Sequence, residues 1–301
     1  MGASTRSNSS TSASPQCPHR SASAHQAAAR GASVVCLGRR PGPVGEHRPW
    51  DAAHQVPDLS GVDAVVHLAA AVGDPPPSAA AEAAYRAVNV DGTARLLSAA
   101  GDRPVVWVSS ASVYRPGRTG TAVREDHPCD GQRTAYGRSK AAGERLALHA
   151  GAVVLRPRAV YGDGDPHLLP RLRRLLRGGR LLLPGPDVTL SLTAVQNLAD
   201  ACLAAVDWPP GPYNVADPVV YSRDATLSAQ FGVPVRHVPL PVARAATVVA
   251  GLTRLAGHRP ALTRYAVEQL SDGLVLDISR ALAAGWAPRH TRAGAVRPQR
   301  G

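Results

Sequence analysis

Tyr136 and Lys140 are the residues of this chain whose types and spacing most clearly suit chemistry. On a helix, side chains four residues apart share one face, so the Lys140 ammonium is expected beside the Tyr136 phenol. A phenol has a reference pKa of about 10, and a nearby positive charge favours its phenolate form. The pair therefore predicts an acid–base site, in which the hydroxyl of Ser110 holds the substrate oxygen.

Lys140 is the only lysine among the 34 basic residues, and the other 33 are arginines. Where a positive charge alone is sufficient, this chain uses arginine. A compact ammonium differs from a guanidinium because it acts as a point donor and can lower the pKa of a neighbour. The composition thus favours a functional role for Lys140 over a chance lysine on a helix surface.

The net charge of +12 favours anionic partners such as nucleotides or acidic substrates. The densest basic run, Arg171 to Arg180, interleaves arginines with leucines from Leu168 onward at helical spacing. We therefore expect an amphipathic helix with a solvated basic face there. No stacking aromatic residues accompany these arginines, so no nucleic-acid partner is expected.

The cysteines and the apolar runs indicate the compartment. Cys17, Cys36, Cys129 and Cys202 are far apart and lack metal-ligand spacing, so we expect reduced thiols and no metal. No apolar run approaches the roughly 18 to 20 residues of a membrane span. The N-terminus lacks the apolar core of a signal peptide. These features predict a cytoplasmic protein with no membrane span.

Strand-like and helix-like segments alternate along the first half of the chain. Strands are expected over residues 33–37, 63–70, 104–108 and 151–157, and helices over 24–30, 79–100 and 136–149. This alternation predicts an α/β fold with a doubly wound parallel sheet, whose ligands bind at the carboxyl ends of the strands. Ser109 and Ser110 fall at such an end.

Three regions are expected along the chain. Residues 1–24 contain no Val, Ile, Leu or Phe and predict a disordered tail. Residues 25–165 are expected to form the main α/β domain, to which the family resemblance assigns cofactor binding. Residues 166–301 are expected to form mainly a smaller part, to which the same resemblance assigns substrate binding, with some elements returning to the main domain. Within it we expect a strand near 189–192, a helix over 197–206, a strand at 213–215 and a lid or core helix over 240–255.

Six segments, taken together and in order, resemble the extended short-chain dehydrogenase/reductase family, also called the NAD-dependent epimerase/dehydratase family. The segments are Val65-Val66-His67-Leu68-Ala69-Ala70, Asn89-Val90-Asp91-Gly92-Thr93, Val108-Ser109-Ser110-Ala111-Ser112-Val113-Tyr114, Tyr136-x-x-x-Lys140, Leu155-Arg156-Pro157-Arg158-Ala159-Val160-Tyr161-Gly162, and Asp277-Ile278-Ser279-Arg280-Ala281 with Gly285-Trp286. Each segment is weak evidence alone, but the six segments in this order are specific to the family.

The resemblance implies a Rossmann-type domain that binds a nicotinamide cofactor, a smaller C-terminal substrate-binding part, a small-molecule substrate and a possible homodimer. Tyr136 would be the catalytic acid/base, Lys140 would lower its pKa and bind the nicotinamide ribose, and Ser110 would orient the substrate oxygen. The other residues expected at the cofactor are Leu68, Ala69, Ala70, Asn89, Ser109, Pro157 and Val160. Asn89 would also help to order the site, and a polar contact within the helices is an equal alternative to a catalytic role for it.

The glycine-rich phosphate loop of the family is missing, because no glycine lies between Gly2 and Gly31. Without it there is no tight turn through which the backbone approaches a pyrophosphate, so weak cofactor binding is expected. One hypothesis is a misassigned or frame-shifted start, or a decayed gene. Sequencing the locus tests it, since an intact frame with no alternative start would refute the hypothesis.

The choice of cofactor depends on the residues after the strand at 33–37. Arg39 and Arg40 stand there in place of a carboxylate, which suits the 2′-phosphate of NADP and makes NADP preferred over NAD. Two solvated arginines are the alternative. Asp51 is expected near the adenine on position alone.

The expected reaction is hydride transfer between nicotinamide and a secondary alcohol or ketone, on an alicyclic, steroid-like or secondary-metabolite substrate. Ala111 and Ser112 replace the acidic pair of the family's dehydratases, which disfavours dehydration. Residues 156–162 lack the asparagine that many nucleotide-sugar epimerases offer to a diphosphate. Epimerisation of a nucleotide sugar is therefore the alternative reaction, and an impaired Rossmann protein that acts by binding is the alternative from another class.

Overall fold

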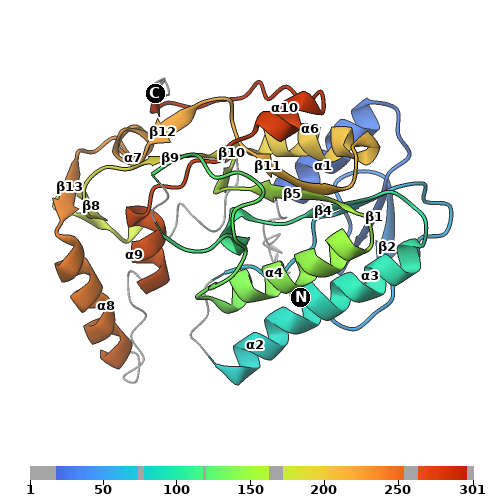
Figure 1. The fold of residues 1–301 in the computed structure, drawn as a ribbon, viewed down its shortest axis with the longest axis horizontal. Coiled ribbons are helices and arrows are strands. Elements are labelled where there is room, and N and C mark those ends of the chain that lie inside the picture. The colour runs from blue at the N-terminus through green and yellow to red at the C-terminus, as the bar shows by residue number, and fades with distance from the viewer. Residues whose placement is uncertain (1–17, 74–77, 118–119, 163–171, 254–263, 297–301) are drawn as a thin grey trace, which may run out of the picture.

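The protein is described by a computed structural model that covers residues 18–73, 78–117, 120–162, 172–253 and 264–296 (Figure 1). Its main sheet has four parallel strands in the order β11-β5-β4-β3. They are β3 (Val65–His67), β4 (Val105–Val108), β5 (Val153–Pro157) and β11 (Gly211–Val215). Every residue of β5 is buried, as in a strand covered on both faces.

Helices cover both faces of this sheet, which confirms the doubly wound α/β class (Figure 1). One face carries α2 (Ala79–Arg86), the π-helical turn η1 (Ala87–Asp91), α3 (Gly92–Ala100) and α4 (Ala135–His149). The other face carries α1 (Pro18–Ala29), α6 (Val195–Ala204) with the 3-10 turn η3 (Ala205–Asp207), and α10 (Ser279–Ala283).

The expected helix over residues 79–100 is present but contains the π turn. Gly92 directly follows the π turn. A side chain at this position would lie 2.3 Å from the carbonyl oxygen of Ala52, so glycine is required for this close packing.

A second parallel sheet contains only β1 (Val35–Gly38) and β2 (Glu46–Pro49). Among the described residues, no strand joins it to β3 of the main sheet. The first helix begins at Pro18, although the sequence predicts a disordered tail as far as residue 24. Ser23 and Ala24 are buried, and α1 packs on α6. Tertiary contacts therefore order a segment whose own apolar content is low. Residues 1–17 of the predicted tail lie outside the described residues.

The expected arginine–leucine helix is present only at Leu172 and Arg173 among its described residues, and it is wrong beyond them. After a turn at residues 174–175 the chain forms a hairpin of β7 (Leu176–Arg177) and β8 (Arg180–Pro184). Gly178 and Gly179 have φ of 54° and 69°, the left-handed conformation that two-residue hairpin turns require. The pair of glycines is thus the signal that outweighs the helical spacing. Residues 168–171 of the predicted helix lie outside the described residues.

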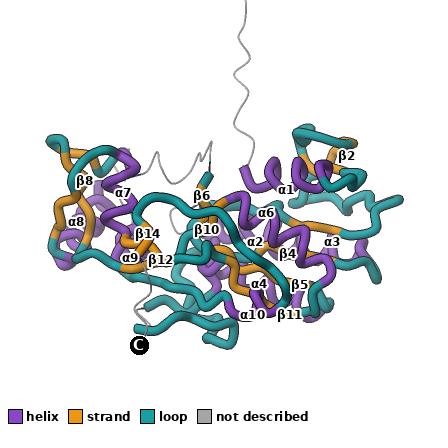
Figure 2. The backbone as a smooth tube through the Cα atoms, turned by 90° about the horizontal axis from the view of Figure 1, so that it is seen from above, coloured by secondary structure: helices purple, strands orange, loops and turns teal. Residues whose placement is uncertain are grey.

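The remaining C-terminal elements form small sheets and helices around this hairpin. Figure 2 shows this group at the end of the molecule opposite α3 and β2. It comprises α7 (Arg223–Phe231), β13 (Val235–Val238), α8 (Leu240–Thr253) and α9 (Arg264–Ser271) beside the hairpin, with β6 (Val160–Tyr161), β9 (Thr189–Leu190), β10 (Thr193–Ala194), β12 (Val220–Ser222) and β14 (Ala295–Val296) nearer the main sheet. The 3-10 turn η2 (Ala111–Val113) belongs to the first half of the chain and follows β4. The division into a cofactor-binding and a substrate-binding part stays a prediction.

None of the helices in the described part of the chain is both long and apolar enough to span a membrane. The apolar stretch at 240–255 forms α8 as far as Thr253, and its last two residues lie outside the described residues.

Candidate functional site

Helix α4 carries both Tyr136 and Lys140, and its start is fixed by a cap. The hydroxyl of Thr134 accepts the backbone N–H of Gly137 at 3.0 Å. Farther along, a side chain on Gly143 would meet the carbonyl oxygen of Asn89 at 2.2 Å, so α4 packs directly against the π turn. The expected helix at 136–149 is confirmed. Its N-terminal cap and its contact with the π turn together fix the position of the predicted acid–base pair.

Lys140 is almost completely buried, with 2% of its surface exposed. Its Nζ donates to the carbonyl oxygen of Val108 at 2.6 Å and lies 3.7 Å from the centre of the Trp107 ring. Burial lowers the pKa of Lys140 to about 7, and the nearby Glu144 carboxylate opposes part of that shift. The lone lysine therefore reaches the carboxyl end of β4, next to Ser109 and Ser110.

Ser110 and Tyr136 are partly exposed, as groups that meet a substrate must be. Ser110 caps η2: its hydroxyl accepts the N–H of Ser112 at 3.2 Å and donates to the Ser112 hydroxyl at 3.1 Å. The Tyr136 ring contacts the Tyr85 ring edge to face, with centroids 6.4 Å apart. Helix α2 thus packs against the ring of the predicted catalytic tyrosine.

Asn89 joins the end of β3 to α4 through its side-chain amide. Its Oδ1 accepts the N–H of Ala71 at 2.8 Å, and its Nδ2 donates to the Ala71 carbonyl at 3.0 Å and to the Ser139 hydroxyl at 2.9 Å. Asn89 is buried at 1% exposure in the π turn, a helix irregularity often found at functional sites. The side chain therefore positions the segment after β3 against the residue before Lys140, which supports the site-ordering alternative.

A buried polar network beneath these residues was missed by the sequence reasoning. Ser109 donates to the Glu144 carboxylate, which also accepts from Arg156 at 2.5 and 3.1 Å. Arg156 donates to the Tyr114 hydroxyl at 3.0 Å, and Tyr114 donates to Asn214 at 2.6 Å. Burial raises the pKa of the Tyr114 phenol. A signal for part of the network was available, since Glu144 follows Lys140 by one helical turn.

The residues predicted around the cofactor fall in three places. Arg39 and Arg40 are exposed just after β1 and line a cavity together with Leu68 and Ala69, which Ala70 follows. Pro157 is buried at the end of β5, and Val160 pairs with Thr193.

Asp51 is not among the residues that line this cavity. Its carboxylate accepts the N–H of Ala53 at 2.9 Å in a local turn. The role of each of these residues toward a cofactor stays a prediction.

The donor set fits the nicotinamide end of a dinucleotide better than the phosphate end. Hydroxyl, amide and ammonium groups gather at the carboxyl ends of β3 and β4, where ligands of parallel sheets bind. Ahead of Gly31 the sequence offers no glycine after Gly2, so the residue type that a pyrophosphate turn requires is missing there. Among the described residues, no group of His, Cys, Asp and Glu could hold a metal ion.

Comparison with known proteins settles the family. Residues 21–216 match the model of the "NAD dependent epimerase/dehydratase family". The chain belongs to this family. The resemblance in the six sequence segments is thereby confirmed, and the fold agrees with Rossmann-type structures of the same superfamily.

Two solved structures and one curated relative illustrate the likeness. The terminal R domain of the myxalamid PKS-NRPS pathway has a TM-score of 0.69 at 20% identity, covering 90% of this chain and 83% of that one. MoeE5, solved with UDP-glucose and NAD, has a TM-score of 0.63 at 25% identity and 89% coverage of both chains.

The relative is dTDP-4-dehydrorhamnose reductase of Streptomyces griseus, 34% identical over 189 residues, which are 59% of this chain and 57% of the relative. The match thus spans little more than half the length of that protein.

Proposed function

We propose that this chain is an NAD(P)-dependent oxidoreductase that transfers a hydride between nicotinamide and a secondary alcohol or ketone of a small molecule. The observation that carries the proposal is the placement of Lys140. The only lysine of the chain is held by Val108 at the end of β4, on the helix of Tyr136 and beside Ser109 and Ser110. Membership of an NAD-dependent family supports the same chemistry.

In the proposed reaction, nicotinamide supplies or accepts the hydride. Tyr136 gives a proton to the substrate oxygen during reduction, or takes it during oxidation. Ser110 hydrogen-bonds that oxygen, and the positive charge of Lys140 favours the phenolate form of Tyr136. Asn89 keeps the segment at Ala71 against α4, so the predicted cofactor-lining residues stay in register with the acid–base pair.

For the cofactor we propose NADP in preference to NAD. Arg39 and Arg40 follow β1, are exposed and line the cavity beside β3, so their guanidinium groups are available to a 2′-phosphate. NAD is the alternative, since MoeE5 was solved with NAD. The substrate class we propose is an alicyclic, steroid-like or secondary-metabolite alcohol, and we further propose a cytoplasmic enzyme that forms a homodimer.

Nucleotide-sugar epimerisation is a second candidate function, and two comparisons bear on its substrate. MoeE5 was solved with UDP-glucose, and the Streptomyces relative is named as a reductase of a dTDP-sugar, so both favour the nucleotide-sugar substrate and not the epimerisation step itself. Against it, Ala159 stands with φ of 42° in the turn after β5, in the stretch where many such epimerases carry an asparagine. A third candidate, a protein that binds without catalysis, is favoured by the missing phosphate turn.

The test is calorimetric titration of NADPH and NADH into the full chain and into Lys140→Ala, with Arg145→Ala on the exposed side of α4 as the matched control. Binding that Lys140→Ala weakens at least tenfold and Arg145→Ala leaves unchanged supports the oxidoreductase. A panel of ketones and nucleotide sugars then separates reductase from epimerase. A folded chain that binds neither cofactor would refute the proposed activity and leave the binding protein.

A further inference from the structure

Two side chains of α4, one helical turn apart, bind consecutive residues at the end of β4. Lys140 Nζ donates to the carbonyl oxygen of Val108 at 2.6 Å, and the Glu144 carboxylate accepts the hydroxyl of Ser109. The end of β4 is thus attached to α4 at two points. Both attachments come directly before Ser110, the residue predicted to hold the substrate oxygen.

The backbone around Ser110 is held on both sides. The N–H of Ser109 donates to the carbonyl oxygen of Leu155 on β5 at 2.7 Å, and the Ser109 side chain is buried. On the other side, the carbonyl oxygen of Ser110 accepts the N–H of Val113 at 3.1 Å. The position of the Ser110 hydroxyl therefore depends on where Ser109 is held.

The two oxygens of the Glu144 carboxylate have different partners. Oε1 accepts from Arg156 twice, from Nε at 3.1 Å and from Nη2 at 2.5 Å. Oε2 accepts from Ser109. Both side chains of the ion pair are 4% exposed. Arg156 therefore fixes the orientation of the carboxylate, and the second oxygen is available to the end of β4.

Glu144 also acts on the charge of Lys140. Burial lowers the pKa of the lysine, and the Glu144 carboxylate opposes that shift, because a nearby negative charge favours the ammonium. The lysine and the glutamate share a face of α4, since four residues separate them. One carboxylate thus contacts the serine segment and favours the charged form of the lysine.

Other ionisable groups surround this pair. Tyr136 stands one turn before the lysine on α4, and Arg156 comes from β5. Tyr114 and Cys129 come from the segment between η2 and α4, and burial raises the pKa of both, so both are neutral at neutral pH. Glu125 accepts from Arg156 through its backbone carbonyl, and its carboxylate accepts a backbone N–H of β11. Among the described residues, Glu144 is therefore the carboxylate that favours the ammonium.

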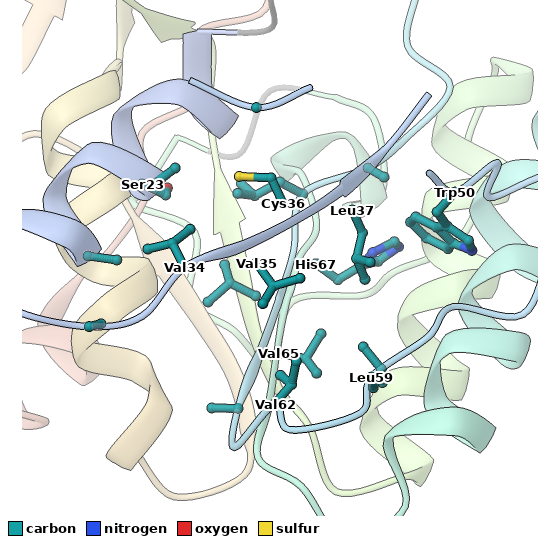
Figure 3. A pocket seen from close by; sticks show the side chains of 18 of the residues that line it. Ser23, Val34, Val35, Cys36, Leu37, Trp50, Leu59, Val62, Val65 and His67 are labelled. Atoms are coloured by element: carbon teal, nitrogen blue, oxygen red, sulfur yellow. The ribbon is translucent and has the colours of Figure 1, made fainter. Parts of the chain in front are cut away.

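Stability alone is a weak reason for this buried ion pair. Apolar residues of similar volume in place of such a pair are often neutral or stabilising. Its location beside the proposed acid–base residues points instead to a role in the site. Glu144 does not line the cavity between β1 and β3 (Figure 3), so its effect on the site passes through Ser109 and Lys140.

We propose that Glu144 is a positioning residue of the oxidoreductase proposed above, on which this inference rests. Glu144 holds Ser109 on α4 and thereby fixes the hydroxyl of Ser110. Its negative charge favours the ammonium form of Lys140. Two groups of the acid–base site thus depend on one buried carboxylate.

The first test is an NMR titration of the lysine. Because Lys140 is the only lysine, protein made with ¹³C-labelled lysine gives the side-chain signals of that residue alone. Glu144→Gln keeps the size of the side chain and removes its charge, so the titration midpoint should fall by about one pH unit or more, about tenfold in proton affinity. Glu82→Gln is the matched control. It removes a half-exposed carboxylate that pairs with Arg138 on the same helix, and it should leave the midpoint unchanged.

The second test is kinetic and separates position from charge. With a substrate that the parent turns over, Glu144→Gln should lower kcat about tenfold or more and change the KM for the cofactor less than about twofold, because Ser110 acts on the reacting oxygen. Glu144→Asp keeps the charge but is one methylene too short for Ser109. It should therefore lower kcat while the lysine midpoint stays within about half a pH unit of the parent.

Two results would overturn the proposal: an unchanged lysine midpoint in Glu144→Gln, or an unchanged kcat in the folded variant. If Glu144→Gln does not fold, Glu144→Asp decides, since an unchanged kcat there contradicts the positioning of Ser110. Failure of the proposed function is a separate result. It would be seen in the parent, which would bind neither cofactor, and the lysine midpoint would still test the effect of the Glu144 charge.

Discussion

Replacing Lys140 with methionine should stabilise the folded chain at neutral pH, although it removes a hydrogen bond. Lys140 is buried, and its pKa falls from 10.5 to about 7. Above pH 10.5 the amine is neutral in the folded and unfolded chains alike. As the pH falls toward 7, only the unfolded chain takes up the proton, so the folded state loses stability. Below pH 7 the loss is constant.

The pKa difference sets the size of the effect. At about 1.4 kcal/mol per pH unit, a shift from 10.5 to about 7 corresponds to on the order of 5 kcal/mol. Methionine removes this penalty but leaves the Val108 carbonyl without its donor, which costs about 1–3 kcal/mol. We therefore expect Lys140→Met to be about 2–3 kcal/mol more stable than the parent at pH 7.

The assay is urea unfolding of the parent, Lys140→Met and Arg145→Met at pH values from 6 to 9.5. The advantage of Lys140→Met should shrink by about 3 kcal/mol between pH 7 and 9.5, since the buried amine of the parent stops costing stability. Arg145→Met removes the same charge from the exposed side of α4 and should give a curve parallel to the parent. Parallel curves for Lys140→Met as well would refute the reasoning, because they would mean that the ammonium is solvated.

Substitutions at three further positions test other parts of the structure by urea unfolding at pH 7. Arg156→Met should lower the free energy of unfolding by about 3–5 kcal/mol, because the Glu144 carboxylate stays buried without its partner. A loss below about 1 kcal/mol would contradict the buried ion pair. Thr134→Ala should cost about 1 kcal/mol by removing the N-cap of α4, and an unchanged midpoint would argue against that cap. Ala159→Val should destabilise the chain by more than about 1 kcal/mol, because a β-branched residue is disfavoured at φ of 42°. Ala159→Gly should be tolerated, because glycine adopts this conformation readily. Equal effects of the two substitutions would exclude the left-handed turn.

Patterns local to the chain were sufficient for much of the fold. Four strands of the first half and the helices at 79–100 and 136–149 follow from runs of apolar residues and their periods, and all are present. The arginine–leucine stretch shows the limit of such patterns, because its spacing suits a helix while Gly178 and Gly179 favour a hairpin. Pairing of β8 with β13, more than fifty residues later, stabilises the hairpin, and no local pattern contains that contact.

By itself, the sequence determined the family, the class of fold and the residues proposed for chemistry, because these depend on residue types at short spacings. Only the tertiary structure decided what surrounds them. The burial of Lys140 against Trp107 and the Glu144–Arg156 pair each join segments distant in sequence. Desolvation arises from such contacts, so the pKa of the lysine follows from the fold and not from the order of residues.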